Sequence, residues 1–326
     1  MTERTYITLY KSGELAARAV KLQEQLYDCN ICPRACHVNR FENIRGFCGS
    51  GQLTSISSYC DHHGEEPALS GTRGSGTIFF HNCNLRCKYC QNHQISQGTD
   101  NLSRTLSCKE LAAIMLHLQN DLGCHNINFV SPSHYVPQIV EALCHAIPGG
   151  LHIPLIYNTN GYDSLDTLKM LDGVIDIYLP DLKYADNRYA DEFSNCSNYV
   201  ESSRPAIKEM YRQAGKLVSD ESGIAQSGLI VRHLILPNDI AGSADSLRWL
   251  ASDISKDVTV SVMAQYYPCF LAWQEPMLSR KITPAEYARV VEVLQELHLD
   301  NGWLQEIDSS EFYLPDFQRQ GHPFSR

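Results

Sequence analysis

The stretch Thr77-Ile-Phe-Phe-His-Asn-Cys-Asn-Leu-Arg-Cys-Lys-Tyr-Cys-Gln-Asn92 joins a short β-type run to three closely spaced cysteines. The apolar run at residues 77–80 ends just before a loop with the spacing C-x3-C-x2-C at Cys83, Cys87 and Cys90. Three thiolates on one short loop can hold three irons of a four-iron cluster, which leaves the fourth iron open to a small ligand. The pattern therefore predicts a reactive metal centre.

A zinc site is the alternative for the same loop. His81 or His93 could be the fourth ligand beside the three cysteines, since three Cys and one His form an ordinary zinc set. Zinc sites more often pair two short ligand hairpins than use one triplet of this spacing. We therefore favour the iron–sulfur interpretation.

Strand-like and helix-like patterns alternate from residue 77 onward. Two capping boxes, Ser107-Cys-Lys-Glu110 and Thr283-Pro-Ala-Glu286, mark helix starts. Six successive strand–helix units predict an α/β fold with a parallel sheet and right-handed crossovers, which can curl into part of a barrel. The six apolar, β-branched runs lie at residues 77–80, 126–130, 153–157, 174–179, 229–236 and 258–264.

The beginning of the chain differs from this alternation. A helix candidate at residues 12–26 precedes a cysteine-rich stretch at residues 29–60. We therefore expect two parts. Residues 1–66 would form an N-terminal helix with a small cysteine-rich module, and residues 67–326 a partial barrel with a C-terminal extension.

Four cysteines of the N-terminal module form a second candidate metal site. Cys29, Cys32, Cys36 and Cys48 have the spacing C-x2-C-x3-C-x11-C. Four thiols at such spacing can close a tetrahedral zinc site or hold a second iron–sulfur cluster. The alternative is a set of reduced thiols, because free cysteine is often buried as a small hydrophobe.

Composition excludes several classes of protein. The chain has 326 residues and a net charge of −10, without any run of Lys and Arg, so nucleic-acid binding is not indicated. No 18-residue apolar window and no signal-peptide pattern occurs, so we expect a cytoplasmic protein without a membrane partner. Thirteen cysteines in such a chain indicate metal ligands and buried thiols rather than disulfides.

The cysteine spacing, the aromatic Tyr89 before the third cysteine and the preceding β-type run together resemble the signature of radical S-adenosylmethionine (SAM) enzymes. The resemblance implies a [4Fe-4S] cluster whose open iron binds SAM. In that family an electron from the reduced cluster cleaves SAM to methionine and a 5'-deoxyadenosyl radical, which abstracts a substrate hydrogen. It also implies a partial (β/α)6 barrel, with ligands at the carboxyl ends of the strands.

Further motifs resemble a group of homologues of pyruvate formate-lyase activating enzymes. The resemblance implies an oxidoreductase that activates a glycyl-radical enzyme, with an electron donor such as flavodoxin or ferredoxin and a protein substrate. A radical SAM enzyme acting on a small molecule or peptide and a non-catalytic zinc scaffold are the alternatives. The motifs are Gly64-Glu-Glu-Pro67, Ser70-Gly-Thr-Arg-Gly-Ser-Gly76, Gly123-Cys-His-Asn126, Val130-Ser-Pro-Ser-His134, Tyr157-Asn-Thr-Asn-Gly161, Asp181-Leu-Lys183 and Phe312-Tyr-Leu-Pro-Asp-Phe317.

The resemblance also suggests residues for SAM. Activating enzymes carry Gly-Gly-Glu after the second barrel strand, where this chain has a Ser-Pro-Ser turn that offers hydroxyls and a helix N-terminus. Plain helix capping is the alternative for either serine, and an ion pair at a strand end is the alternative for Arg232. The expected SAM contacts are Tyr89, Ser131, Ser133, Asn158, Thr159, Asp181 and Arg232.

A polar group precedes the first of the six runs. His62, His63, Glu65 and Glu66 could serve acid–base or metal chemistry. Radical hydrogen abstraction needs no general base, and paired histidines in a loop are more often solvated or capping residues. We therefore expect no catalytic role for this group.

Overall fold

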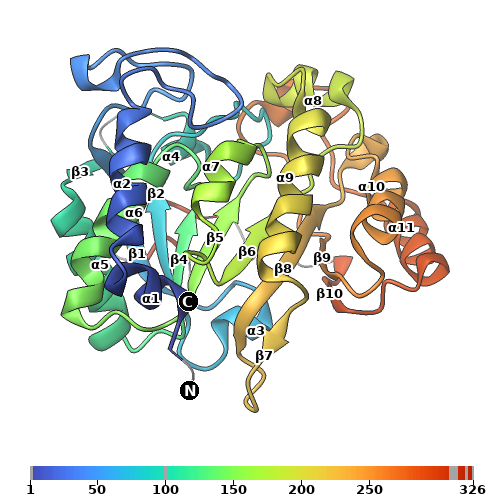
Figure 1. Ribbon diagram of the computed structural model, residues 1–326. Coiled ribbons are helices and arrows are strands. Elements are labelled where there is room, and N and C mark those ends of the chain that lie inside the picture. Colours follow the sequence, from blue (N-terminus) through green and yellow to red (C-terminus); the bar gives the residue numbers. More distant parts are fainter. Residues whose placement is uncertain (1–2, 99–101, 308–314, 320–321, 325–326) are drawn as a thin grey trace.

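The computed structural model describes residues 3–98, 102–307, 315–319 and 322–324 (Figure 1). Its centre is a sheet with the strand order β10-β9-β8-β6-β5-β4-β2-β1-β3. Seven neighbouring strands of this sheet are parallel. They are β2 (Ser75–Phe80), β4 (Ile127–Val130), β5 (Leu155–Thr159), β6 (Ile177–Pro180), β8 (Ala225–Leu234), β9 (Thr259–Met263) and β10 (Gly302–Leu304).

The parallel sheet and the alternation of strands and helices confirm the predicted α/β class. Each of the six runs contributes one strand, although the observed bounds differ by a few residues. The three-residue strand β10 was not predicted, and it extends the sheet beyond β9. Three further strands are antiparallel to their neighbours: β1 (Thr54–His62) to β2, β3 (Arg104–Leu106) to β1, and β7 (Val218–Ser219) to β8.

Helices cover the outer face of the sheet (Figure 1). Both predicted capping boxes are present, at Ser107 before α5 and at Thr283 before α11. No described helix is long and apolar enough to cross a membrane. The longer helices are α5 (Cys108–Asn120), α6 (Val136–Ala146), α8 (Asn187–Ser194), α9 (Tyr199–Ala214) and α11 (Pro284–Leu297), and the shorter ones are α3 (Pro67–Ser70), α4 (His93–Ser96), α7 (Leu165–Met170) and α10 (Ser243–Trp249).

The N-terminal segment lies against the outside of this layer. The predicted helix at residues 12–26 is α2 (Glu14–Glu24), and α1 (Thr5–Lys11) precedes it. Gly13 separates the two helices because its φ of 80° lies in the left-handed region, which suits glycine. Strand β1 belongs to the first 66 residues but pairs with β2, so the sheet itself crosses the predicted boundary.

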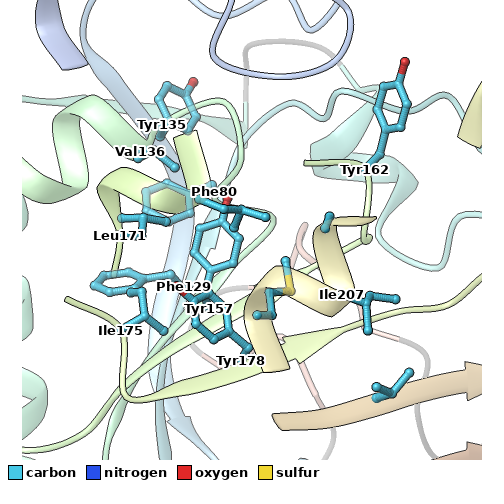
Figure 2. Packing of buried hydrophobic residues seen from close by; sticks show 14 of the residues in the cluster. Phe80, Phe129, Tyr135, Val136, Tyr157, Tyr162, Leu171, Ile175, Tyr178 and Ile207 are labelled. Carbon is cyan, nitrogen blue, oxygen red and sulfur yellow. The ribbon is translucent and has the colours of Figure 1, made fainter. Parts of the chain in front are cut away.

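The outer face of the sheet is aromatic (Figure 2). Phe80, Phe129, Tyr157 and Tyr178 lie on four neighbouring strands and are fully buried. Tyr157 packs edge-on against Tyr178 with ring centroids 5.9 Å apart, and its hydroxyl donates a 2.8 Å hydrogen bond to Asp163. Because side chains alternate along a strand, this packing directs the residues between them to the inner face.

We expect Phe129→Ala to lower the free energy of unfolding by about 3–5 kcal/mol, because it removes a fully buried ring and leaves a cavity. Urea denaturation of matched anaerobic samples measures the change. Leu53→Ala is the control, since Leu53 is 52% exposed and its loss should cost no more than about 0.5 kcal/mol. Equal effects of the two substitutions would contradict the packing described above.

Candidate active site

The loop that carries Cys83, Cys87 and Cys90 starts directly after β2 and is tied to α8 by its backbone. The amide of Arg86 donates to the carbonyl of Ser194 at 3.1 Å, and the amide of Lys88 donates to the carbonyl of Phe193 at 2.8 Å. The chain must turn sharply at the start of the loop, where Asn82 has a φ of 74°. These bonds hold the loop over the carboxyl end of the sheet.

Each of the three sulfur atoms has a polar neighbour. Asn160 Nδ2 lies 3.4 Å from Cys83 Sγ, Ser194 Oγ donates to Cys87 Sγ at 3.0 Å, and Ser96 Oγ lies 3.1 Å from Cys90 Sγ. Burial raises the pKa of all three thiols, to about 11 for Cys83. The thiols are therefore protonated at neutral pH, and a metal would displace those protons on binding.

The three cysteines open into one cavity of about 850 Å³ in the barrel. Among the described residues no fourth cysteine lines this cavity, and neither His81 nor His93 does. The ring of His93 instead stacks on Phe270, with centroids 4.9 Å apart. The zinc alternative that used either histidine therefore has no fourth ligand at this place.

The placement of the sulfurs bears on the kind of metal centre. Within the described parts of the chain, no three or more His, Cys, Asp or Glu side chains are arranged so that they could hold one metal ion. A mononuclear zinc ion needs its ligands to converge on one point, whereas each thiolate of a four-iron cluster binds a different iron. Three separate thiols around one cavity therefore fit the cluster better than the ion.

A charged network crosses the cavity from the cysteine loop. Lys183 Nζ donates to Asp181 Oδ2 at 2.7 Å, and Arg232 Nε donates to Asp181 Oδ1 at 2.9 Å. Arg232 also donates to Asn158 Oδ1 at 2.6 Å and lies 3.4 Å from Glu65 Oε2. Asp181 and Arg232, predicted from separate strands, are thus in direct contact beside the cysteines.

The protonation states of this network follow from its pairing. Burial alone would raise the pKa of Asp181, but the Arg232 and Lys183 cations lower it below its ordinary value. Burial would lower the pKa of Lys183, but Asp181 and Cys87 raise it. Asp181 is therefore ionised and Lys183 protonated at neutral pH, which places one fixed cation close to the thiols.

The other residues expected to contact SAM divide into two groups. Tyr89, Ser131 and Thr159 line the same cavity. Ser133 does not: it is buried beside Thr159, with the two hydroxyl oxygens 3.2 Å apart, while Thr159 donates to Asp163. Ser133 thus lies behind Thr159 and is not among the residues that line the cavity, and its contact with SAM stays a prediction.

Some residues at the site were missed by the sequence analysis. Lys183 and Asn160 lie inside the motifs Asp181-Leu-Lys183 and Tyr157-Asn-Thr-Asn-Gly161, so their motifs carried a signal. Ser96 and Ser194 carried none, because only the folded chain brings α4 and the end of α8 to the cysteine sulfurs.

The members of the polar group before β2 lie in different surroundings, and the expectation that they have no catalytic role stays a prediction. His62 is buried and packs on Phe324, with ring centroids 4.2 Å apart, so it is not solvated. Glu65 and Glu66 line the cavity. His63 is half exposed and lies 3.4 Å from Asp61, as a solvated histidine would.

The tail motif is described only in part. Residues 312–314 lie outside the described residues, whereas Phe317 packs edge-on against Phe79 of β2 with centroids 5.2 Å apart. Gln94 of α4 accepts a 2.7 Å hydrogen bond from the Phe317 amide. The tail therefore returns to the barrel beside the first strand.

The four N-terminal cysteines also share one place. Cys29, Cys32, Cys36 and Cys48 line a small cavity of about 10 Å³, which is the space of about one water. Burial raises the pKa of Cys32 to about 12, and the other three thiols add to that effect. The cavity size favours a single ion over a cluster, although the thiols are not arranged as a finished ligand set for one ion. None of the thirteen cysteines, all of which lie within the described residues, forms a disulfide.

The comparison with known families is consistent with this geometry. A family model described as the radical SAM superfamily matches residues 77–218, which begin at β2 and include the cysteine loop and most of the charged network. Residues 77–218, somewhat less than half of the chain, thus match the radical SAM superfamily. The three cysteines and the open cavity beside them fit the [4Fe-4S] cluster and SAM that this superfamily implies, because three thiols leave one iron without a protein ligand.

Two proteins of Methanocaldococcus jannaschii are similar in sequence. The uncharacterized protein MJ0674 is 29% identical over 89% of this chain and 81% of its own length. The uncharacterized protein MJ0808 is 27% identical over 46% of this chain and 48% of its own length.

Two solved structures are more distant in sequence. Streptococcus suis SuiB, bound to its precursor peptide SuiA, has 12% identity and a TM-score of 0.46 over 70% of this chain and 48% of that chain. HydG, a maturase of the [FeFe]-hydrogenase, has 11% identity and a TM-score of 0.46 over 69% of this chain and 50% of that chain. This chain thus spans about half the length of each.

We expect the four N-terminal cysteines to bind a metal of their own, because four thiolates brought together without one would stay reactive. A protein with Cys83, Cys87 and Cys90 all replaced by Ala should still contain zinc or iron by elemental analysis. Adding Cys32→Ala to that triple variant is the matched comparison and should remove it. A triple variant without either metal would leave these four residues as a set of reduced thiols.

Proposed function

We propose that this radical SAM protein is an oxidoreductase that binds a [4Fe-4S] cluster at Cys83, Cys87 and Cys90, cleaves SAM reductively and takes a hydrogen atom from a substrate in the barrel. The observation that carries the proposal is the single cavity that joins three thiols, an ionic network and no fourth cysteine among the described residues. When bound and reduced, the cluster supplies the electron that cleaves SAM to the 5'-deoxyadenosyl radical.

The chain's own residues would bind and orient the other groups. Asp181 offers a carboxylate to an ammonium group, while Arg232 and Lys183 offer donors to a carboxylate, so the three together suit the zwitterionic methionyl end of SAM. Tyr89, buried between the second and third cysteines, offers a ring face for the adenine. Lys183 also offsets the negative charge that three thiolates bring into a buried site.

Two candidates remain for the hydrogen donor. The motifs shared with pyruvate formate-lyase activating enzymes support a glycine of a glycyl-radical enzyme, with a flavodoxin or ferredoxin as electron donor. The depth of the cavity, which continues past Arg232 to Glu65 and Glu66, supports a small molecule or a peptide side chain as the second candidate.

Replacement of Cys87 by Ala should abolish 5'-deoxyadenosine formation, because two thiolates cannot hold the cluster in this loop. The measurement is anaerobic incubation of reconstituted protein with SAM and dithionite, together with iron analysis. Cys144→Ala is the matched control, since Cys144 lies on α6 outside the cavity and its thiol donates to the Val140 carbonyl. Full deoxyadenosine formation by the Cys87→Ala protein would refute the cluster assignment.

Replacement of Asp181 by Ala should weaken SAM binding by roughly 1.5–3 kcal/mol, the range for a lost charge-assisted contact. The iron content should stay that of the wild type, because Asp181 touches no cysteine sulfur in the hydrogen-bond network. Equilibrium binding of SAM to the reconstituted proteins gives the change, and Asp181→Asn keeps the side-chain shape while removing the charge. An unchanged dissociation constant in both variants would exclude Asp181 from the SAM site.

A further inference from the structure

The floor of the barrel is a short segment between β1 and α3. His62, the last residue of β1, pairs with Ser75 at the start of β2, so this segment lies at the amino ends of the parallel strands. The cysteine loop follows Phe80 at the opposite end of the same strand. Glu65 and Glu66 from this floor nevertheless line the cavity that the cysteines open into.

The two carboxyl groups are used differently. Glu65 Oε1 accepts from Asn128 at 3.0 Å and from Asn158 at 3.3 Å, and Glu65 Oε2 faces Arg232. Glu66 is only 8% exposed, and its Oε2 is buried without a hydrogen-bond partner among the described residues. Although Glu66 is the N-cap residue of α3, its side chain makes no capping bond. Its neighbours Glu65 and the Ser261 hydroxyl interact with this carboxyl, but neither supplies a positive charge to it.

Burying an ionised carboxyl group costs folding free energy unless a positively charged or hydrogen-bonding group pairs with it. Burial raises the pKa of Glu66 to about 7, and the Glu65 carboxylate adds to this, while Arg232 and the Ser261 hydroxyl act in the opposite direction. The Glu66 carboxyl therefore holds its proton more readily than an exposed glutamate does. Since a buried, unpaired carboxylate is strongly disfavoured, a cation bound beside Glu66 would complete the site.

The charges of the residues that line the cavity also indicate that a cation binds there. Its described lining contains three carboxyl groups, on Glu65, Glu66 and Asp181, but only two permanent cations, Lys183 and Arg232. SAM does not supply the missing charge, because its net positive charge is offset by the net negative charge of a cluster held by three thiolates. One further positive charge would balance the three carboxyl groups of the lining.

His62, which also lines the cavity, does not supply that charge either. Burial lowers the pKa of His62 to about 4, helped by the nearby His322 and His63, so it is neutral at pH 7. His63 is half exposed and lies beside Asp61 instead.

We propose that Glu66 binds a protonated amine of the substrate, so that the substrate is an alkylamine held by its nitrogen at the floor with its carbon chain extending toward the cysteine loop. This proposal rests on the function proposed above and names the substrate class for the same cavity. A volume of about 850 Å³ is near the upper end of ligand sites, which span about 300–1,000 Å³. The amine can belong to a free small molecule or to a lysine side chain.

Calorimetric titration of the full-length, anaerobically reconstituted protein tests this without requiring turnover. The probes are n-pentylamine, n-pentanol as its uncharged match, and a short peptide with one central lysine. Pentylamine should bind at least about tenfold more tightly than pentanol, the lower limit for a hydrogen bond between charged partners. Its binding should also release protons at pH 7, because an ammonium group favours the ionised form of Glu66. The peptide distinguishes the two sources, since it binds only if a side chain can reach the floor.

Glu66→Gln keeps the shape of the side chain and should reduce the preference for pentylamine over pentanol to less than about threefold, with no proton release. Glu221→Gln, at an exposed position, is the control and should keep the wild-type preference. Equal binding of pentylamine and pentanol to the wild type, or an unchanged preference in a folded Glu66→Gln protein, would overturn the proposal. Because SAM cleavage is assayed separately, loss of the amine site and failure of the proposed radical function give different results.

Discussion

A buried guanidinium group organises the inside of the barrel. Arg232 lies on β8, and its side chain reaches Asp181 after β6, Asn158 of β5 and Glu65 of the floor. A charge removed from water costs several kcal/mol of desolvation, which only close pairing offsets. The partners must therefore lie on the inner face of the sheet within hydrogen-bonding distance of Arg232. This requirement links the register of three strands to the position of the floor segment.

This constraint explains why the floor is part of the active cavity. Without Glu65, Arg232 would lose one of its two carboxylate partners, and without Arg232 the pKa of both floor carboxyl groups would rise further. The charged network extends from Glu65 through Arg232 and Asp181 to Lys183. A change of charge at the floor is therefore transmitted through this network toward the cysteine loop, as expected for charges in a buried, low-dielectric environment.

The sequence predicted what depends on local pattern. The six parallel strands followed from apolar, β-branched runs, and the helix starts at Ser107 and Thr283 from their capping boxes. Strand β10 was missed because it has only three residues, two of them exposed. The surroundings of the buried Glu66 carboxyl were missed because Arg232 and Ser261, which act on its pKa, are distant in sequence. Local sequence patterns thus predicted the strands and helix starts better than they predicted the buried charged groups inside the barrel.

The N-terminal module contributes to the site through its contacts and not only through its cysteines. Arg34, between Cys32 and Cys36, donates to the Asn84 carbonyl of the cysteine loop at 2.9 Å and stacks on Phe47 at 3.7 Å. Arg86 of that loop donates to the Phe47 carbonyl at 2.8 Å, so each part holds the backbone of the other. Any metal that orders the four N-terminal thiols would therefore also restrain the loop of Cys83, Cys87 and Cys90, which makes the module a support for the reactive centre.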